Sequence, residues 1–139
     1  MTKEPLELGR NLILVVDTDH RVLRFTSIGL RSAGYDVLTS TDGENGVNIA
    51  ESQRPDIILL DVSMMRPNAA DIMRALRAVT AAPIIALSID DSTRGEMQEL
   101  GAADFVGKPF YMDDLLKRIS DLLHQSKDKG TDGAGPKAS

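Results

Sequence analysis

The stretch Pro55-Asp56-Ile57-Ile58-Leu59-Leu60-Asp61 decides the fold of this chain. Four consecutive large aliphatic residues predict a strand that is buried on both faces, because a half-exposed strand would alternate polar and apolar residues. Strands of this kind occupy the middle of parallel sheets. In open α/β sheets ligands bind at the carboxyl ends of the strands, so Asp61 is the first candidate for a functional side chain.

Two other apolar runs end in a similar way. Residues 11–16 are followed by Asp17, and residues 83–87 are followed by Ser88. The carboxyl ends of parallel strands meet at one edge of a sheet, so these oxygen-bearing side chains and Asp61 are expected to form a polar pocket. The alternative, that they only cap the segments that follow them, stays open because Asp and Ser are common at such turns.

Strand and helix patterns alternate five times. Two short strands are expected at residues 35–38 and 104–107, and helices at residues 20–33, from 42 to near 55, around 72–79, from 90 to 101 and at 112–125. This alternation predicts right-handed crossovers and an α/β fold, a doubly wound, five-stranded parallel sheet with helices on both faces. Residues 112–125 carry an aliphatic stripe that is expected to contact the core.

Composition narrows the classes of function. The 139 residues fit one domain, and the absence of Cys excludes disulfides, thiolate metal sites and Cys nucleophiles. The net charge of −5 argues against non-specific nucleic-acid binding and suits a divalent cation or a basic partner. No apolar run approaches the ~20 residues of a membrane span, and the N-terminus lacks a signal-peptide core, so a cytoplasmic location is expected. Residues 1–10 read as a polar leader, and residues 126–139 as a disordered tail or linker.

Five segments in chain order resemble the receiver domain of response regulators, the CheY-like family of two-component signalling. They are Ile13-Leu14-Val15-Val16-Asp17, Gly34-Tyr35-Asp36-Val37, residues 55–61, Gly101-Ala102-Ala103-Asp104-Phe105 and Lys108-Pro109-Phe110. The resemblance covers residues 11–125. It implies a flavodoxin-like (βα)5 three-layer sandwich, in agreement with the alternation above.

The resemblance also implies roles for individual residues. Asp61 matches the phosphoacceptor aspartate, and Asp17, Asp61 and the carbonyl of Ser63 match the positions that hold Mg²⁺. Lys108 matches the lysine that contacts a phosphoryl oxygen, and its bond to the next proline is expected to be cis. Ser88 matches the hydroxyl that donates to the phosphoryl group.

The remaining matched position is Phe105, which corresponds to an aromatic residue that switches together with this hydroxyl. Outside the pattern, each of these residues has an ordinary interpretation. Ser88 could be a strand-end hydroxyl, Lys108 a surface lysine and Phe105 a core aromatic residue.

By resemblance, the domain is a phosphoprotein rather than an enzyme, with at most self-catalysed phosphoryl transfer and autodephosphorylation. A histidine kinase or phosphotransfer protein phosphorylates Asp61, Ser88 and Phe105 shift inward, and a partner-binding face is remodelled. The expected partners are a downstream effector domain or protein and, through the face bearing the fourth and fifth helices, a second copy of the domain. Contact with a membrane and direct nucleic-acid binding by this domain are not expected.

Several positions depart from the family pattern. Thr18 stands where a second acid usually binds the metal, so Mg²⁺ affinity should fall; Asp19 is either a substitute ligand or a helix cap. Ile89 replaces a small residue beside the site and should restrict access. The loop after residue 61 departs too, with Met65, a displaced Pro67 and Asn68-Ala69 in place of Asp-Gly, so it is expected to take another path.

These departures leave two alternatives. The first is a pseudo-receiver, an interaction module that works without phosphorylation. The second belongs to another class: Asp17-Thr18-Asp19 is a DxD motif at a strand end, as in haloacid-dehalogenase-like phosphohydrolases, where Asp17 would be the nucleophile and Asp19 the acid/base. The chain lacks the substrate-covering insertion of those enzymes.

Overall fold

The structure, a computed structural model, describes residues 10–63 and 69–134 and contains one five-stranded sheet. The strands lie in the order β2-β1-β3-β4-β5, and every neighbouring pair is parallel. Their bounds are β1 (Leu12–Val16), β2 (Asp36–Ser40), β3 (Ile57–Asp61), β4 (Ile84–Ser88) and β5 (Asp104–Gly107). The doubly wound α/β fold expected from the sequence is confirmed.

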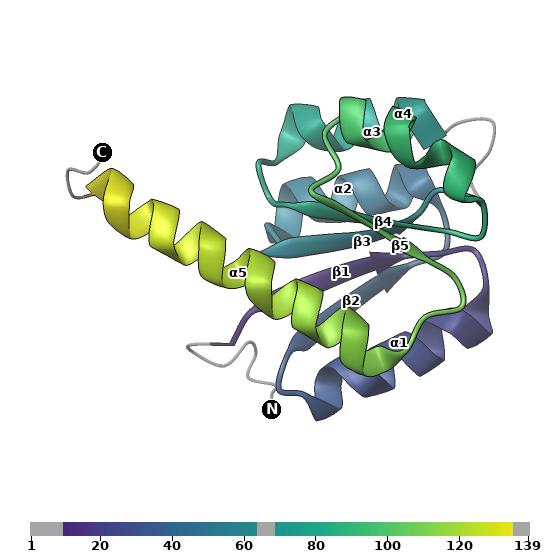
Figure 1. Ribbon diagram of the computed structural model, residues 1–139, viewed down its shortest axis with the longest axis horizontal. Coiled ribbons are helices and arrows are strands. Elements are labelled where there is room, and N and C mark those ends of the chain that lie inside the picture. Colours follow the sequence, from purple (N-terminus) through teal and green to yellow (C-terminus); the bar gives the residue numbers. More distant parts are fainter. Residues whose placement is uncertain (1–9, 64–68, 135–139) are drawn as a thin grey trace.

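Helices cover both faces of the sheet. They are α1 (His20–Ser32), α2 (Gly43–Gln53), α3 (Ala69–Val79), α4 (Arg94–Glu99) and α5 (Met112–Ala134), with a single 3₁₀ turn, η1 (Asp91–Thr93), before α4. Helices α1 and α5 lie on one face, and α2, α3 and α4 lie on the other (Figure 1). Among the described residues, no helix combines the length and hydropathy needed to cross a membrane.

The central strand β3 is buried along its whole length. Its residues alternate between two hydrophobic clusters: Ile58 and Leu60 pack on the side of α2, α3 and α4, whereas Ile57 and Leu59 pack on the side of α1 and α5. Burial on both faces is what the unbroken aliphatic run predicted. The sheet is therefore a rigid base for the loops at its carboxyl edge.

Capping aspartates and glycines mark ends of the helices α1, α2 and α4. Asp19 and Asp42 cap α1 and α2, since their carboxylates accept hydrogen bonds from backbone N–H groups in the first turn. Gly34 and Gly101 follow α1 and α4 with φ angles of 100° and 108°, a conformation that glycine adopts without strain. The helix ends expected at these two glycines are confirmed.

Three expected boundaries were wrong. Strand β2 continues past residue 38 to Ser40, because it pairs with β1 through residues that do not read as apolar. The helix expected from residue 90 begins as the 3₁₀ turn η1. Helix α5 continues past residue 125 to Ala134, so this part of the expected disordered tail is helical; the first proline after it is Pro136.

Other expectations lie outside the described residues. They concern residues 1–9 of the polar leader and the loop positions Met65, Pro67 and Asn68.

Candidate functional site

The sheet order brings two carboxylates together at its carboxyl edge. Strands β1 and β3 are neighbours, and the chain leaves β1 toward β2 but leaves β3 toward β4, so the two connections diverge at this point. Such a switch point is where open α/β sheets bind ligands. Asp17 directly follows β1 and Asp61 ends β3, and both side chains have an exposed fraction of 0%. The edge therefore holds two buried acids.

Lys108 supplies the opposing charge from the far end of the chain. Its backbone N–H donates to the carbonyl of Ser88 at 2.8 Å, which extends the β4–β5 pairing by one residue. Its Nζ donates to Oδ2 of Asp61 at 2.6 Å and to Oδ2 of Asp17 at 3.0 Å, with 11% of the side chain exposed. The three residues predicted from separate motifs thus form one cluster, and the Lys108–Pro109 peptide is cis as expected.

Burial and hydrogen bonding shift the pKa values of this cluster. Burial raises the pKa of Asp17 above its ordinary value, although hydrogen bonds from Asp19 and Lys108 oppose the shift. For Lys108, burial lowers the pKa, but the hydrogen bonds with Asp61 and Asp17 outweigh it and the pKa is raised. The ammonium therefore keeps its proton at neutral pH and can meet an incoming anion.

The second oxygen of Asp61 is held by Ser63. Both the backbone N–H and the hydroxyl of Ser63 donate to Oδ1 of Asp61, at 2.9 Å and 2.7 Å. The sequence interpretation gave Ser63 a role only through its carbonyl, so this hydroxyl was missed. A signal was present, because a Ser two residues after an Asp is a common local hydrogen-bonding partner. Lys108 and Ser63 together fix the orientation of the carboxylate.

Ser88 is turned toward the loop that follows it. Its side chain is 1% exposed, and its Oγ accepts a hydrogen bond from the N–H of Asp90 at 2.9 Å and donates to the carbonyl of Asp90 at 3.2 Å. The hydroxyl therefore stands at the expected edge of the sheet, engaged in closing the β4–α4 loop.

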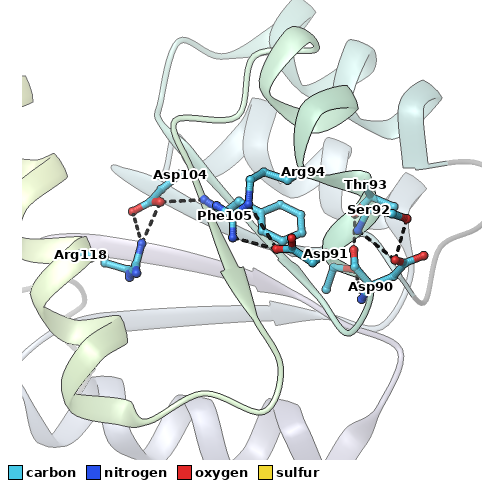
Figure 2. A network of polar contacts seen from close by, with 9 residues as sticks. Asp90, Asp91, Ser92, Thr93, Arg94, Asp104, Phe105 and Arg118 are labelled. Atoms are coloured by element: carbon cyan, nitrogen blue, oxygen red, sulfur yellow. Dashed lines mark hydrogen bonds and ion pairs between the residues drawn. The ribbon is translucent and has the colours of Figure 1, made fainter.

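Phe105 lies inside the domain, with an exposed fraction of 1%. The guanidinium of Arg94 lies over its ring, with Cζ 4.6 Å from the ring centroid (Figure 2). An inward shift of this residue on phosphorylation was expected from the family resemblance. The structure shows one position of the ring, and the switching of Phe105 stays a prediction.

Thr18, Asp19 and Ile89, which depart from the family pattern or adjoin a departure, lie in different environments. Thr18 is exposed at the turn, and Ile89 is 71% exposed. Asp19 accepts hydrogen bonds from Arg21 and Val22, which lower its pKa, and its own N–H donates to Oδ1 of Asp17 at 2.9 Å. Asp19 is thus the α1 cap and a support for Asp17. Since its carboxylate is engaged in this way, the structure gives no support to Asp19 as the acid/base of a phosphohydrolase.

The donor set suits a magnesium ion that keeps several waters. Mg²⁺ in proteins is commonly bound through one or two carboxylates, and the site offers those of Asp17 and Asp61, which share the contact with Lys108. Within residues 10–63 and 69–134, no set of three or more His, Cys, Asp or Glu side chains is arranged to hold a metal. The residues fit the ion, with one carboxylate fewer than a family site that has an acid at position 18.

Comparisons with known sequences agree with this geometry. The family model described as the response regulator receiver domain matches residues 13–120. The transcriptional regulatory protein KdpE of Mycobacterium tuberculosis is 36% identical over 110 residues, which are 78% of this chain and 49% of that protein. The alkaline phosphatase synthesis transcriptional regulatory protein PhoP of Bacillus subtilis is 33% identical over 118 residues, 83% of this chain and 49% of that protein. The chain spans about half the length of these relatives.

Solved structures show the same architecture. The receiver domain of the Francisella response regulator 1452 superposes with a TM-score of 0.77 at 27% identity, covering 84% of this chain and 99% of that one. The receiver domain of the sensor histidine kinase PA1611 from Pseudomonas aeruginosa superposes with a TM-score of 0.75 at 29% identity, with the same coverage. That structure is described with a magnesium ion coordinated in its active site cleft.

Proposed function

Because the chain belongs to the response regulator receiver domain family, we propose that it is a phosphoacceptor domain in which Asp61 takes a phosphoryl group from a histidine kinase or phosphotransfer protein. The observation that carries the proposal is the 2.6 Å contact between Nζ of Lys108 and Oδ2 of Asp61. It places a fixed positive charge beside a buried carboxylate, at the edge of the sheet where ligands bind.

The proposed reaction transfers a phosphoryl group from the donor to the side chain of Asp61. A carboxylate oxygen of Asp61 forms a bond to phosphorus while the bond from phosphorus to the donor breaks, and the donor nitrogen keeps the electron pair. Catalysis of such transfers rests on positioning and on neutralising the charge of the phosphoryl oxygens. Ser63 orients the carboxylate, and the ammonium of Lys108 moves from Asp61 to a phosphoryl oxygen.

A magnesium ion, if bound, would supply further positive charge to neutralise the phosphoryl oxygens. Asp17, Asp61 and the carbonyl of Ser63 are the groups that would hold it. Because Thr18 contributes no charge, affinity for the ion is expected to be lower than with an acid at that position. The magnesium-bound structural relative supports the choice of ion.

We also propose the bounds of the domain, its location and its downstream partner. Residues 11–125 form the receiver domain, and residues 1–10 precede it as a leader. The domain acts in the cytoplasm as a signalling protein rather than an enzyme, with at most self-catalysed phosphoryl transfer and autodephosphorylation. The names of the relatives describe transcriptional regulators, which supports an effector domain or protein as the downstream partner. Dimerisation and direct nucleic-acid binding are not required.

Intact-protein mass spectrometry tests the proposal. Wild type, Asp61→Asn, Asp17→Asn and Asp71→Asn are incubated with Mg²⁺ and a small acyl phosphate. Asp71 is a control acid whose side chain is 78% exposed on α3. We expect wild type and Asp71→Asn to gain the mass of one phosphoryl group and Asp61→Asn to gain none. Phosphorylation that survives Asp61→Asn but is lost in Asp17→Asn would assign the reaction to Asp17 and refute the proposal. No gain with either the acyl phosphate or the cognate kinase would identify a pseudo-receiver.

A further inference from the structure

A groove runs between helix α1 and the edge strand β2, which lie next to each other in the fold (Figure 1). Its volume is about 480 Å³, within the range of ~300–1,000 Å³ that is typical of small-molecule pockets. Helix α1 forms one wall. The other wall comes from the end of β2 and the loop after it, where Thr39 and Thr41 supply hydroxyl groups.

One stripe of α1 makes the groove basic. Residues spaced three or four apart lie on the same face of a helix, and four residues of α1 with this spacing line the groove. They are His20, Arg24, Ser27 and Arg31. Among the described residues that line the groove, none is acidic, although the whole chain carries a net charge of −5. Asp19 and Asp42, which adjoin the groove in sequence, are engaged as helix caps. The groove is therefore suited to an anion.

The two arginines differ in how far their donors are used. Nη2 of Arg31 donates to the carbonyl of Val37 at 3.1 Å, which anchors this guanidinium against β2. Within residues 10–63 and 69–134, the side chain of Arg24 makes no hydrogen bond or ion pair. A guanidinium carries five N–H donors, so both arginines keep donors for the oxygens of a ligand. Arg31 is a fixed donor, and Arg24 is an uncommitted one.

Ser27 is a second, independent indication of a ligand. The residue is 5% exposed and lines the groove, and its Oγ has no hydrogen-bond partner among the described residues. Burying a hydroxyl without a partner costs free energy, and native proteins leave few such groups. In sequence, Ser27 lies between Arg24 and Arg31 on the same stripe of α1. An anion held by the two guanidiniums would offer this hydroxyl the acceptor that it lacks.

We propose that the groove binds a small phosphorylated molecule of about the size of a mononucleotide. Arg24 and Arg31 bind the phosphate oxygens, because the planar guanidinium matches the geometry of a phosphate, and Ser27 donates a further hydrogen bond. A phosphate ion alone would leave most of the 480 Å³ empty, so the groove has room for the rest of the molecule. The exposed side chain of Ile28 offers an apolar surface for that part. This site is separate from the cluster around Asp61 and does not rest on the proposed function.

Two-dimensional ¹H–¹⁵N NMR of the full chain locates the binding site. The probes are AMP, inorganic phosphate and adenosine, which lacks the phosphate. EDTA removes divalent cations that could hold a phosphate at the acidic cluster, and sodium chloride keeps the ionic strength constant. We expect AMP to shift the amide signals of Ser27, Thr39 and Thr41 and to leave those of Ser63 and Lys108 in place. Inorganic phosphate should shift the same signals with lower affinity, and adenosine should shift none.

The decisive variants are Arg24→Gln and a matched control, Arg74→Gln. Arg74 lies on α3, outside the groove, with 64% of its side chain exposed. Loss of one charge-assisted hydrogen bond should weaken AMP binding about tenfold in Arg24→Gln, whereas the control should bind like wild type. Arg24→Lys keeps the charge but not the planar fork, so its affinity should lie between those of Arg24→Gln and wild type.

Ser27→Ala separates a binding role from a structural one. The change removes a buried hydroxyl without a partner, so urea unfolding should show a stability equal to or above that of wild type. AMP binding should nevertheless weaken about fivefold, because one hydrogen bond to the phosphate is lost. Unchanged affinity in this variant would refute the role of Ser27 in the site.

Other outcomes would overturn the proposal as a whole. One is the absence of any shift at the groove with millimolar AMP. Another is a set of shifts centred on Lys108, which would assign the phosphate to the acidic cluster. Equal weakening by Arg24→Gln and Arg74→Gln would reveal a general effect of net charge, and equal affinities for AMP and inorganic phosphate would refute recognition of the larger molecule. None of these measurements depends on whether Asp61 accepts a phosphoryl group.

Discussion

Replacing Lys108 with methionine separates the charge of this residue from its bulk. The change keeps an unbranched chain in a site where the side chain is only 11% exposed, but it removes the cation that contacts Asp61 at 2.6 Å and Asp17 at 3.0 Å. Both carboxylates are fully buried, so neither can recover its interaction from bulk water. Removing one partner of a buried ion pair typically costs about 3–5 kcal/mol, and we expect Lys108→Met to lower the free energy of unfolding by about that amount at neutral pH.

Urea unfolding followed by circular dichroism measures this cost. The control is Lys117→Met, since Lys117 contacts Asp121 at 3.1 Å with 75% of its side chain exposed. An exposed pair of this kind contributes about 0–1 kcal/mol, so the control should unfold close to wild type. The deficit of Lys108→Met should shrink as the pH falls toward the pKa of Asp17, which burial raises, because protonation of Asp17 removes one of the charges that need a cation. Added Mg²⁺ should stabilise Lys108→Met more than wild type, because the ion no longer competes with the ammonium.

Equal stabilities of the two lysine variants at neutral pH would refute this reasoning. Such a result would mean that Lys108 does not neutralise the two carboxylates in the folded protein. A deficit that grows at low pH would have the wrong sign for the same electrostatic argument.

Three more changes test other parts of the structure. Thr18→Asp adds a charged ligand at the metal position, and isothermal titration calorimetry should show roughly tenfold tighter Mg²⁺ binding; unchanged affinity would mean that position 18 does not face the ion. Leu59→Ala empties a fully buried site in β3 and should cost about 2–5 kcal/mol in urea unfolding, whereas no loss would contradict its place in the core. Burial raises the pKa of Tyr35 above 10.0, so the folded state holds the phenolic proton longer and wild type should lose stability relative to Tyr35→Phe as the pH rises through that value. Parallel stability curves for these two proteins at alkaline pH would show that Tyr35 ionises alike in both states.

The aliphatic runs predicted the sheet well because burial on both faces leaves an unbroken apolar pattern. Strands β1, β3, β4 and β5 lie within one residue of their expected positions. The predicted strand β2 was too short. Thr39 and Ser40 pair with β1 through their backbones, and a hydropathy pattern does not register such pairing. The predicted helix α5 was also too short, because Gly and polar residues after 125 suggested disorder. None of these residues blocks a helix as a proline does.

The candidate site was predictable only in part. The strand-end positions of Asp17, Asp61 and Ser88 follow from the alternation of strands and helices, but the role of Lys108 came from the family resemblance alone. Contacts between side chains of adjoining loops leave no periodic pattern in the sequence. The stacking of Arg94 on Phe105 therefore could not be foreseen, since it depends on the path of the loop between β4 and α4.

The late position of Lys108 in the chain has a consequence during synthesis on the ribosome. Asp17 follows β1 and Asp61 ends the neighbouring strand β3, and both strands are complete well before Lys108 is made, 47 residues after Asp61. At about 5–20 residues per second, those 47 residues take about 2–9 s to add. Throughout that interval a growing chain that pairs β1 with β3 places two acids side by side without the cation that follows β5. A free metal ion or proton is then the available counter-charge, so the nascent domain should depend on divalent cations more than the finished one.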